Sequence, residues 1–200
     1  MKSILLVMLV CLVGAPAMAE NETIFGGPIV NGGYGAPVVK FGQIGDESAV
    51  WVGGKGGWLI NHTFMIGGGG YGLANEVGEN TDEIFWRYPT RKLGIGYGGF
   101  IMEYINKPNR LVHFSFETLI GAGGATYLYR DWDDHWDNNG YTDAFFVLEP
   151  GINIMLNFTE NIRAGAGISY LYSSGLELYD FDDSDLSGPM GQFVLKFGYF

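Results

Sequence analysis

Residues 143–157 read DAFFVLEPGINIMLN, and apolar side chains recur in this stretch at every second position. One parity is apolar from Ala144 to Leu156, while the other carries Glu149 and Asn153. Phe145, Val147 and Met155 are the apolar exceptions on that second parity. A two-residue period is typical of a β-strand whose two faces meet different surroundings.

The same rule, applied outward along the chain, predicts eight strands and no helix. Most of the predicted strands reach the ~10 residues that a tilted strand needs to cross a bilayer. They cover residues 34–44, 48–60, 63–75, 92–105, 110–129, 143–157, 161–176 and 187–200.

The connections between these strands alternate in length. Tight polar turns, NH at 61–62, NKPNR at 106–110 and FTEN at 158–161, alternate with acidic connections, of which three are long. The acidic connections are GDES at 45–48 and the segments 76–91, 130–142 and 178–186. This pattern predicts an all-β fold: an eight-stranded antiparallel up-and-down transmembrane β-barrel with short periplasmic turns and longer extracellular loops.

The N-terminus predicts export. Residues 1–19 have Lys2, a short apolar run and an Ala-Met-Ala ending, and we expect them to be a cleaved signal peptide. Residues 20–33 would then be an N-terminal periplasmic lead-in, and residues 34–200 the barrel. Cleavage removes Cys11, the only cysteine, and Lys2, so the formal net charge moves from −11 to −12. Such an acidic chain is not expected to bind nucleic acid.

Glycine makes up 33 of the 200 residues, in a chain that is 16% aromatic. Gly94, Gly96 and Gly99 fit a dinucleotide-binding spacing, but no helix follows to hold a phosphate. We therefore expect no cofactor, and we assign the glycines to the tight curvature of barrel strands.

The chain ends on an aromatic strand. A closed barrel must pair its last strand with its first, because an open edge in hydrocarbon is costly. Here the chain resembles the small eight-stranded outer-membrane barrels of the OmpA/OmpX-like group, which carry a signal peptide, lack cysteine and end in alternating aromatics closing on Phe. The resemblance implies a bacterial outer-membrane location, and recognition by the assembly machinery through Phe193, Leu195, Phe197, Tyr199 and Phe200.

Phe200 departs from the family pattern, because it falls on the face of Lys196 and Gln192 and not on the apolar face. Either a local bulge re-aims Phe200, or recognition by the assembly machinery tolerates the shift.

The opposite parity would line a narrow lumen that side chains can fill. Because unpaired buried charges are costly, we expect a salt-bridge network inside. Its members would be Lys40, Lys55, Glu103, Glu117, Glu149, Arg163 and Lys196. The alternative is a narrow small-solute channel through these residues.

His113, Ser115 and Glu117 share one strand face. Some outer-membrane barrels that resemble this chain are lipid A deacylases with a His-x-Ser pair and a Glu, so a lipid-modifying enzyme is an alternative. However, the three residues follow a tight turn and face the lumen, far from outer-leaflet lipid. We expect interior polar contacts there and no catalysis.

The long loops gather carboxylates and aromatic rings, which predicts a structural or adhesive, surface-binding role. The candidate residues are Asp131, Trp132, Asp133, Asp134, Trp136, Asp137, Asp180, Asp182, Asp183 and Asp185. Carboxylates can bind Ca²⁺, but neither run fits an EF-hand, so we expect no metal. The expected partners are outer-membrane lipid, lipopolysaccharide and the assembly machinery. We expect a monomer, and the sequence names no extracellular ligand.

A soluble lipocalin-like periplasmic barrel is the remaining alternative. It would enclose Ile168 and Leu148 and expose Arg163 and Glu149, so the placement of these residues separates the two readings.

Overall fold

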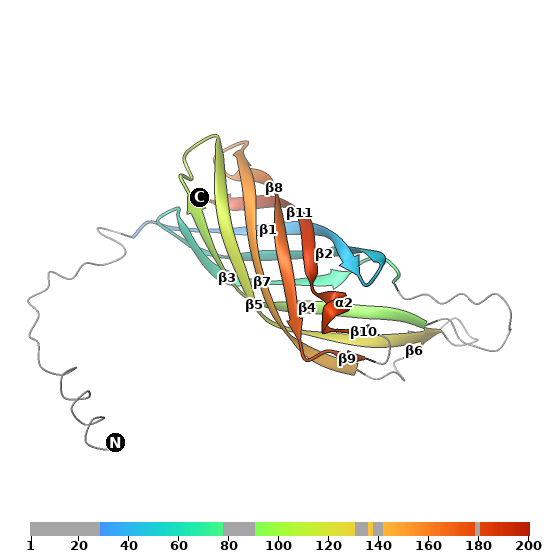
Figure 1. Ribbon diagram of the computed structural model, residues 1–200. Coiled ribbons are helices and arrows are strands. Elements are labelled where there is room, and N and C mark those ends of the chain that lie inside the picture. Colours follow the sequence, from blue (N-terminus) through green and yellow to red (C-terminus); the bar gives the residue numbers. More distant parts are fainter. Residues whose placement is uncertain (1–28, 78–90, 131–135, 138–141, 179–180) are drawn as a thin grey trace, which may run out of the picture.

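Eight long antiparallel strands form the body of the protein. The structure is a computed structural model that describes residues 29–77, 91–130, 136–137, 142–178 and 181–200 (Figure 1). The long strands are β1 (Asn31–Ile44), β2 (Glu47–Ile60), β3 (Phe64–Leu73), β4 (Arg91–Asn106), β5 (Val112–Arg130), β7 (Thr142–Asn157), β8 (Ile162–Ser174) and β11 (Gly188–Tyr199). Shorter elements are β6 (Trp136–Asp137), β9 (Glu177–Leu178), β10 (Phe181–Asp182) and the helix α2 (Asp183–Leu186).

The sheet closes on itself. Each long strand pairs with the next along the chain, and β11 returns to pair with β1, so that Tyr199 lies opposite Gly33 (Figure 1). All pairings between long strands are antiparallel. The predicted fold, an eight-stranded up-and-down barrel, is confirmed.

Two local features differ from the sequence prediction. β1 begins at Asn31, within the stretch assigned to the lead-in, and Gly32 and Gly33 pair with β2. These glycines give no alternation from which a strand could be predicted. The expectation that no helix occurs was wrong for α2, whose four residues are too few to show a helical period. Asp182 starts this helix with a capping box that includes the Asp185 side chain.

Asparagines hold the tight turns at one end of the barrel. Asn61 and His62 form a two-residue hairpin turn with positive φ values of 51° and 60°. The side chain of Asn61 accepts from the Val30 N–H at 2.9 Å. Asn157 donates to the carbonyl of Pro108 on the neighbouring turn, also at 2.9 Å. Asn157 therefore ties its strand to the neighbouring hairpin turn, and Asn61 holds the residue before β1 against the turn between β2 and β3.

The two faces of the barrel differ as the alternation requires. Ile168 is 65% exposed on the outer face, whereas Glu149 and Arg163 are 3% and 6% exposed on the inner face. This arrangement is the reverse of the one that a lipocalin-like barrel needs. No helix in the described part of the chain is long and apolar enough to cross a membrane.

The lumen is apolar toward the long-loop end. Trp51, Val147 and Leu171 are fully buried there, and they belong to one cluster with Val77 after β3 and Leu186 of α2. Val77 and Leu186 lie in the connections, so these connections contribute side chains to the core.

Candidate functional site

The centre of the lumen holds an ion pair between Lys40 on β1 and Glu149 on β7. The lysine Nζ lies 2.6 Å and 2.8 Å from the two carboxylate oxygens. Tyr97 donates to the same carboxylate at 2.9 Å, and Ser169 donates to it at 2.6 Å. Lys40 Nζ also lies 3.5 Å from the ring centre of Tyr71. Both charges therefore have several partners, which buried ions require.

A second pair joins Lys55 on β2 to Glu117 on β5. Gln192 on β11 donates at 2.8 Å to the other oxygen of Glu117, and the same amide nitrogen donates to Asn153 at 2.8 Å. Side chains from four strands thus meet across the lumen and connect its opposite walls.

A third pair lies toward the tight-turn end. Lys196 Nζ on β11 is 2.5 Å from Glu103 Oε1 on β4, and Tyr34 donates to the other carboxylate oxygen. The lysine Nζ also lies 4.5 Å from the Tyr34 ring centre. Six of the seven charged residues predicted to line the lumen are therefore engaged in these three pairs.

Arg163 is the seventh. No carboxylate pairs with it among the residues that the structure describes, and its Nε and Nη1 are buried without a hydrogen bond there. Instead, its guanidinium carbon lies 3.9 Å from the ring centre of Phe200. That ring stacks on Tyr34 with the centroids 5.6 Å apart. The out-of-phase position of Phe200 thus has a physical reason: the ring turns inward and covers a buried cation at the barrel mouth.

The other four residues of the predicted assembly signal point outward. Phe193, Leu195, Phe197 and Tyr199 are all exposed on the outer face of β11. Whether an assembly factor reads them stays a prediction.

His113, Ser115 and Glu117 line the lumen on β5 without forming a catalytic arrangement. His113 Nδ1 lies 3.2 Å from the carbonyl of Arg110, and Glu117 is engaged by Lys55 and Gln192. No hydrogen bond joins His113 to Ser115 in the part of the chain that is described. Glu117 is thus held as an ion-pair partner, and His113 contacts backbone.

The acidic loop candidates are only partly within the described residues. Asp131, Trp132, Asp133, Asp134 and Asp180 lie outside them, and Trp136 and Asp137 are described only as the backbone of β6, which pairs with the end of β5. No group of His, Cys, Asp or Glu with metal-binding geometry occurs among the described residues.

The described loop aspartates bind backbone. Asp183 accepts from the N–H groups of Gly175 and Leu176, each at 2.9 Å. Asp182 accepts from the hydroxyl and the N–H of Ser184, and these bonds lower the pKa of its carboxyl. Asp185 accepts from the N–H of Asp182. These three carboxylates therefore fold the loop around α2.

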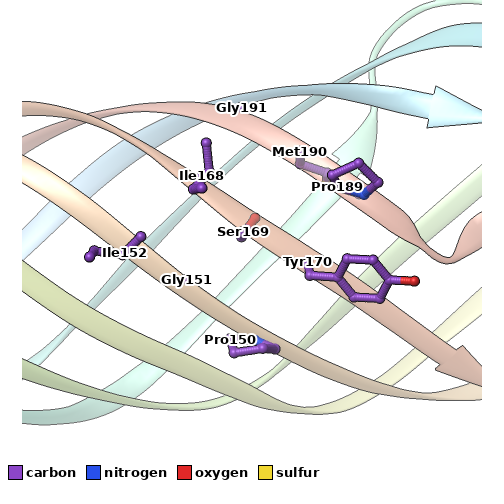
Figure 2. Close-up of a pocket in the computed structure, with 9 residues that line it drawn as sticks. All are labelled: Pro150, Gly151, Ile152, Ile168, Ser169, Tyr170, Pro189, Met190 and Gly191. Atoms are coloured by element: carbon purple, nitrogen blue, oxygen red, sulfur yellow. The ribbon is translucent and has the colours of Figure 1, made fainter.

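An open groove runs over the outside of β7, β8 and β11. It has a volume of about 530 Å³ and is almost entirely apolar. Figure 2 shows its residues, which come from three neighbouring strands: Pro150, Gly151, Ile152, Ile168, Ser169, Tyr170, Pro189, Met190 and Gly191. Sequence reasoning missed this groove, because no single strand shows it.

Sequence reasoning also missed the uncharged members of the lumen network. Tyr34, Tyr97, Ser169 and Gln192 share the inward parity of the charged residues, so the signal was present. Parity alone did not show which of them would reach a carboxylate on another strand.

A closed barrel of eight antiparallel strands, with ions enclosed and apolar side chains outside, has the architecture of the small outer-membrane β-barrels. The solved structure of Neisserial surface protein A (NspA) is similar, with a TM-score of 0.50 at 12% identity, over 86% of this chain and 99% of that one. This likeness concerns the fold.

Two further structures show lower similarity. The attachment invasion locus protein Ail of Yersinia pestis has a TM-score of 0.43 at 15% identity, over 86% of this chain and 96% of its own. CarO2 of Acinetobacter baumannii has a TM-score of 0.40 at 14% identity, over 86% of this chain and 100% of its own. No family model matches the chain, and no curated protein matches its sequence.

Proposed function

We propose that this protein is an integral protein of the bacterial outer membrane, and that its acidic, aromatic loops bind partners at the cell surface. The observation that carries the membrane location is the outer face of the barrel. Large apolar side chains stand exposed there on every long strand, with glycine, alanine and other small residues between them. Examples are Phe41, Val52, Ile66, Phe100, Phe116, Ile154, Ile168 and Phe193.

Such a surface suits hydrocarbon and not water. Monomeric soluble proteins rarely expose continuous apolar patches beyond a few hundred Å². The ionised side chains lie inside, where they find one another. A bilayer is the medium in which this division between faces is favourable, because the closed sheet leaves no backbone edge unpaired.

The surface-binding role is supported by the asymmetry of the two ends. One end has tight turns, whereas the connections of the other end carry the carboxylates and aromatic rings of 76–91, 130–142 and 178–186. The lumen between the two ends is filled by side chains, so solute passage is not supported. An acidic surface favours a cationic partner.

The membrane location is tested by fractionating cells that express the protein and comparing boiled with unboiled samples by gel electrophoresis. We expect the protein in the outer-membrane fraction, with a faster band before boiling. Recovery from the soluble periplasmic fraction would contradict the proposal.

The binding role is tested with the protein in nanodiscs of zwitterionic lipid and a polylysine peptide as the cationic probe. A variant with Asp131, Asp133, Asp134 and Asp137 each replaced by Asn is compared with Glu160→Gln, which changes the opposite, tight-turn end. We expect binding to fall at least fivefold in the loop variant and to be unchanged in Glu160→Gln. Equal binding by both variants would contradict a loop-mediated role.

A further inference from the structure

The groove on the outer wall begins where the sheet surface lacks side chains. On β7 and β8, Leu148 pairs with Tyr172 and Gly151 pairs with Ser169, but no pairing is present at Pro150, which has no N–H to give. The interruption lies between two regular stretches of the ladder, so the wall is uneven there.

On β11, Gly191 lies at the base of the groove and has no side chain to fill it. Its register partners are Ile168 on β8 and Phe41 on β1, both bulky and exposed. A Cβ atom added at Gly191 would meet no atom within 4 Å. A hollow therefore separates two projecting apolar side chains, and Figure 2 shows Tyr170 and Pro189 beside it.

The chemistry of the lining restricts what can fill the groove. No charged side chain lines it, and its Ser169 hydroxyl is turned inward to Glu149 at 2.6 Å. The Tyr170 hydroxyl is the one side-chain polar group of the lining that belongs to the outer face. A volume of about 530 Å³ lies within the ~300–1,000 Å³ of sites that hold small ligands. A flexible hydrocarbon chain fits such a lining.

The position of the groove identifies the source of that chain. Pro189 and Gly191 lie at the start of β11, directly after α2 and the long loop, whereas Pro150 and Ile168 lie near the middle of β7 and β8. The groove therefore extends from the middle of the outer wall toward the long-loop end. It is also continuous with the apolar outer face that is proposed to contact the bilayer. In an outer-membrane barrel the long loops face outward, and the neighbouring leaflet is made of lipopolysaccharide.

We propose that this groove is a binding site for one acyl chain of a lipopolysaccharide molecule. The proposal rests on the proposed membrane location. It goes beyond that location by assigning one lipid molecule to a specific place on the outer wall. Bound lipid would restore a smooth outer wall over Pro150 and Gly191.

The test uses two matched substitutions. Gly191→Phe fills the groove, whereas Gly35→Phe makes the same change on the outer face of β1, where an added Cβ also meets nothing within 4 Å. Gly35 pairs with Phe197 near the opposite end of the barrel and does not line the groove. Both variants are first checked for outer-membrane recovery and a heat-dependent gel shift.

Each purified protein is titrated in detergent with lipid A, and in parallel with phosphatidylethanolamine, and bound lipid is counted by native mass spectrometry. We expect one lipid A per wild-type protein, at least tenfold weaker binding by Gly191→Phe, and wild-type binding by Gly35→Phe. Equal lipid A binding by all three would overturn the site, and equal affinity of the wild type for phosphatidylethanolamine would overturn lipopolysaccharide as the source. A wild-type dimer that Gly191→Phe dissociates would also overturn the proposal, since a second copy would then occupy the groove.

The outcomes distinguish failure of the groove proposal from failure of the proposed membrane location. If the variants fractionate with the outer membrane and bind lipid A equally, the groove proposal fails while the membrane proposal stands. If the wild type is soluble, the membrane proposal fails first.

Discussion

Phe200 ends the chain one residue beyond β11 and turns into the barrel mouth, away from the outward side chains of Phe197 and Tyr199. Its ring stacks on Tyr34 and covers the guanidinium of Arg163. A ring face stabilises a desolvated cation by about 2 kcal/mol. Phe200 therefore provides Arg163 with the partner that no described carboxylate supplies.

A double-mutant cycle tests this contact. Phe200→Leu keeps an apolar group without an aromatic face, and Arg163→Met keeps the apolar stem without the charge. We expect a coupling of about 0.5–2 kcal/mol between the two changes in the free energy of unfolding. Urea unfolding of the barrel in lipid vesicles measures it, and strictly additive effects would show that the ring does not interact with the charge.

The four glycines from Gly67 to Gly70 offer a second comparison between single residues. A Cβ at Gly67 would lie 2.0 Å from the Gly56 oxygen and 2.6 Å from the Gly57 Cα, which are backbone atoms of β2. At Gly70 the nearest atom would be 3.5 Å away. An added Cβ would therefore collide with the β2 backbone at Gly67, whereas at Gly70 its nearest neighbour, the Tyr97 oxygen on β4, lies at an ordinary contact distance.

We predict that Gly67→Ala destabilises the barrel by about 1–3 kcal/mol, because the strands must move apart. Gly70→Ala should change the free energy of unfolding by less than about 1 kcal/mol, since it only restricts the unfolded chain. Urea titrations of the two variants under the same conditions make the comparison. If both variants lost the same free energy of unfolding, the loss would come from replacing a glycine and not from the collision with the β2 backbone.

At the scale of the elements, the lumen side chains join strands that are not neighbours in the sheet. The pair Lys40 and Glu149 links β1 to β7, and the pair Lys196 and Glu103 links β11 to β4. Hydrogen bonds within the sheet hold adjacent strands only, so these ion pairs are contacts across the barrel. Their effect depends on both partners being present.

For Lys40 and Glu149, we predict that Lys40→Met and Glu149→Gln each destabilise the barrel by about 3–5 kcal/mol, because each leaves a buried charge without its counterion. The double variant should be more stable than either single variant, since no buried charge then remains at this position. Unfolding in urea gives the three values. A double variant that loses the sum of the two single effects would contradict the pairing.

The whole molecule shows which parts of the structure a sequence can predict. Alternation places Arg163 and Glu149 on one face and Ile168 on the other, because neighbouring side chains of a strand must point to opposite sides. Turn lengths give the up-and-down order. The approximate strand boundaries could therefore be predicted from alternation and turn residues. The start of β1 could not, because Gly32 and Gly33 have no side chains that show which face they occupy.

Contacts between distant strands could not be predicted in the same way. Whether Lys40 meets Glu149 or Glu117 depends on the stagger of the strands around the barrel, which no single strand encodes. The groove at Gly191 likewise depends on Ile168 and Phe41 lying opposite it from two other strands. For Phe200, alternation places the residue on the inward face with Lys196, and its ring does turn inward. Its contacts with Tyr34 and Arg163, which lie on other strands, could not be predicted from β11 alone.

Barrel closure is the property of the whole molecule on which the other arguments depend, and it can be tested at the seam between β1 and β11. Val39 lies opposite Phe193 in this pairing. Directly opposed residues of antiparallel strands have Cα atoms ~4.5–5.5 Å apart, which is within the ~4.4–6.8 Å that a disulfide spans. The predicted mature chain has no cysteine of its own, so an introduced pair has no competing thiol.

We predict that Val39→Cys with Phe193→Cys forms a disulfide on oxidation of the folded barrel. The crosslink joins the first and last strands into a covalent loop, so the boiled, unreduced chain should migrate faster than the same chain after reduction. Val39→Cys with Tyr199→Cys is the control, because six residues of strand, about 20 Å, separate Tyr199 from the position opposite Val39. A crosslink that forms equally in both variants would show that the two strands are not fixed in this register, and failure of both would show that the seam between β1 and β11 is open.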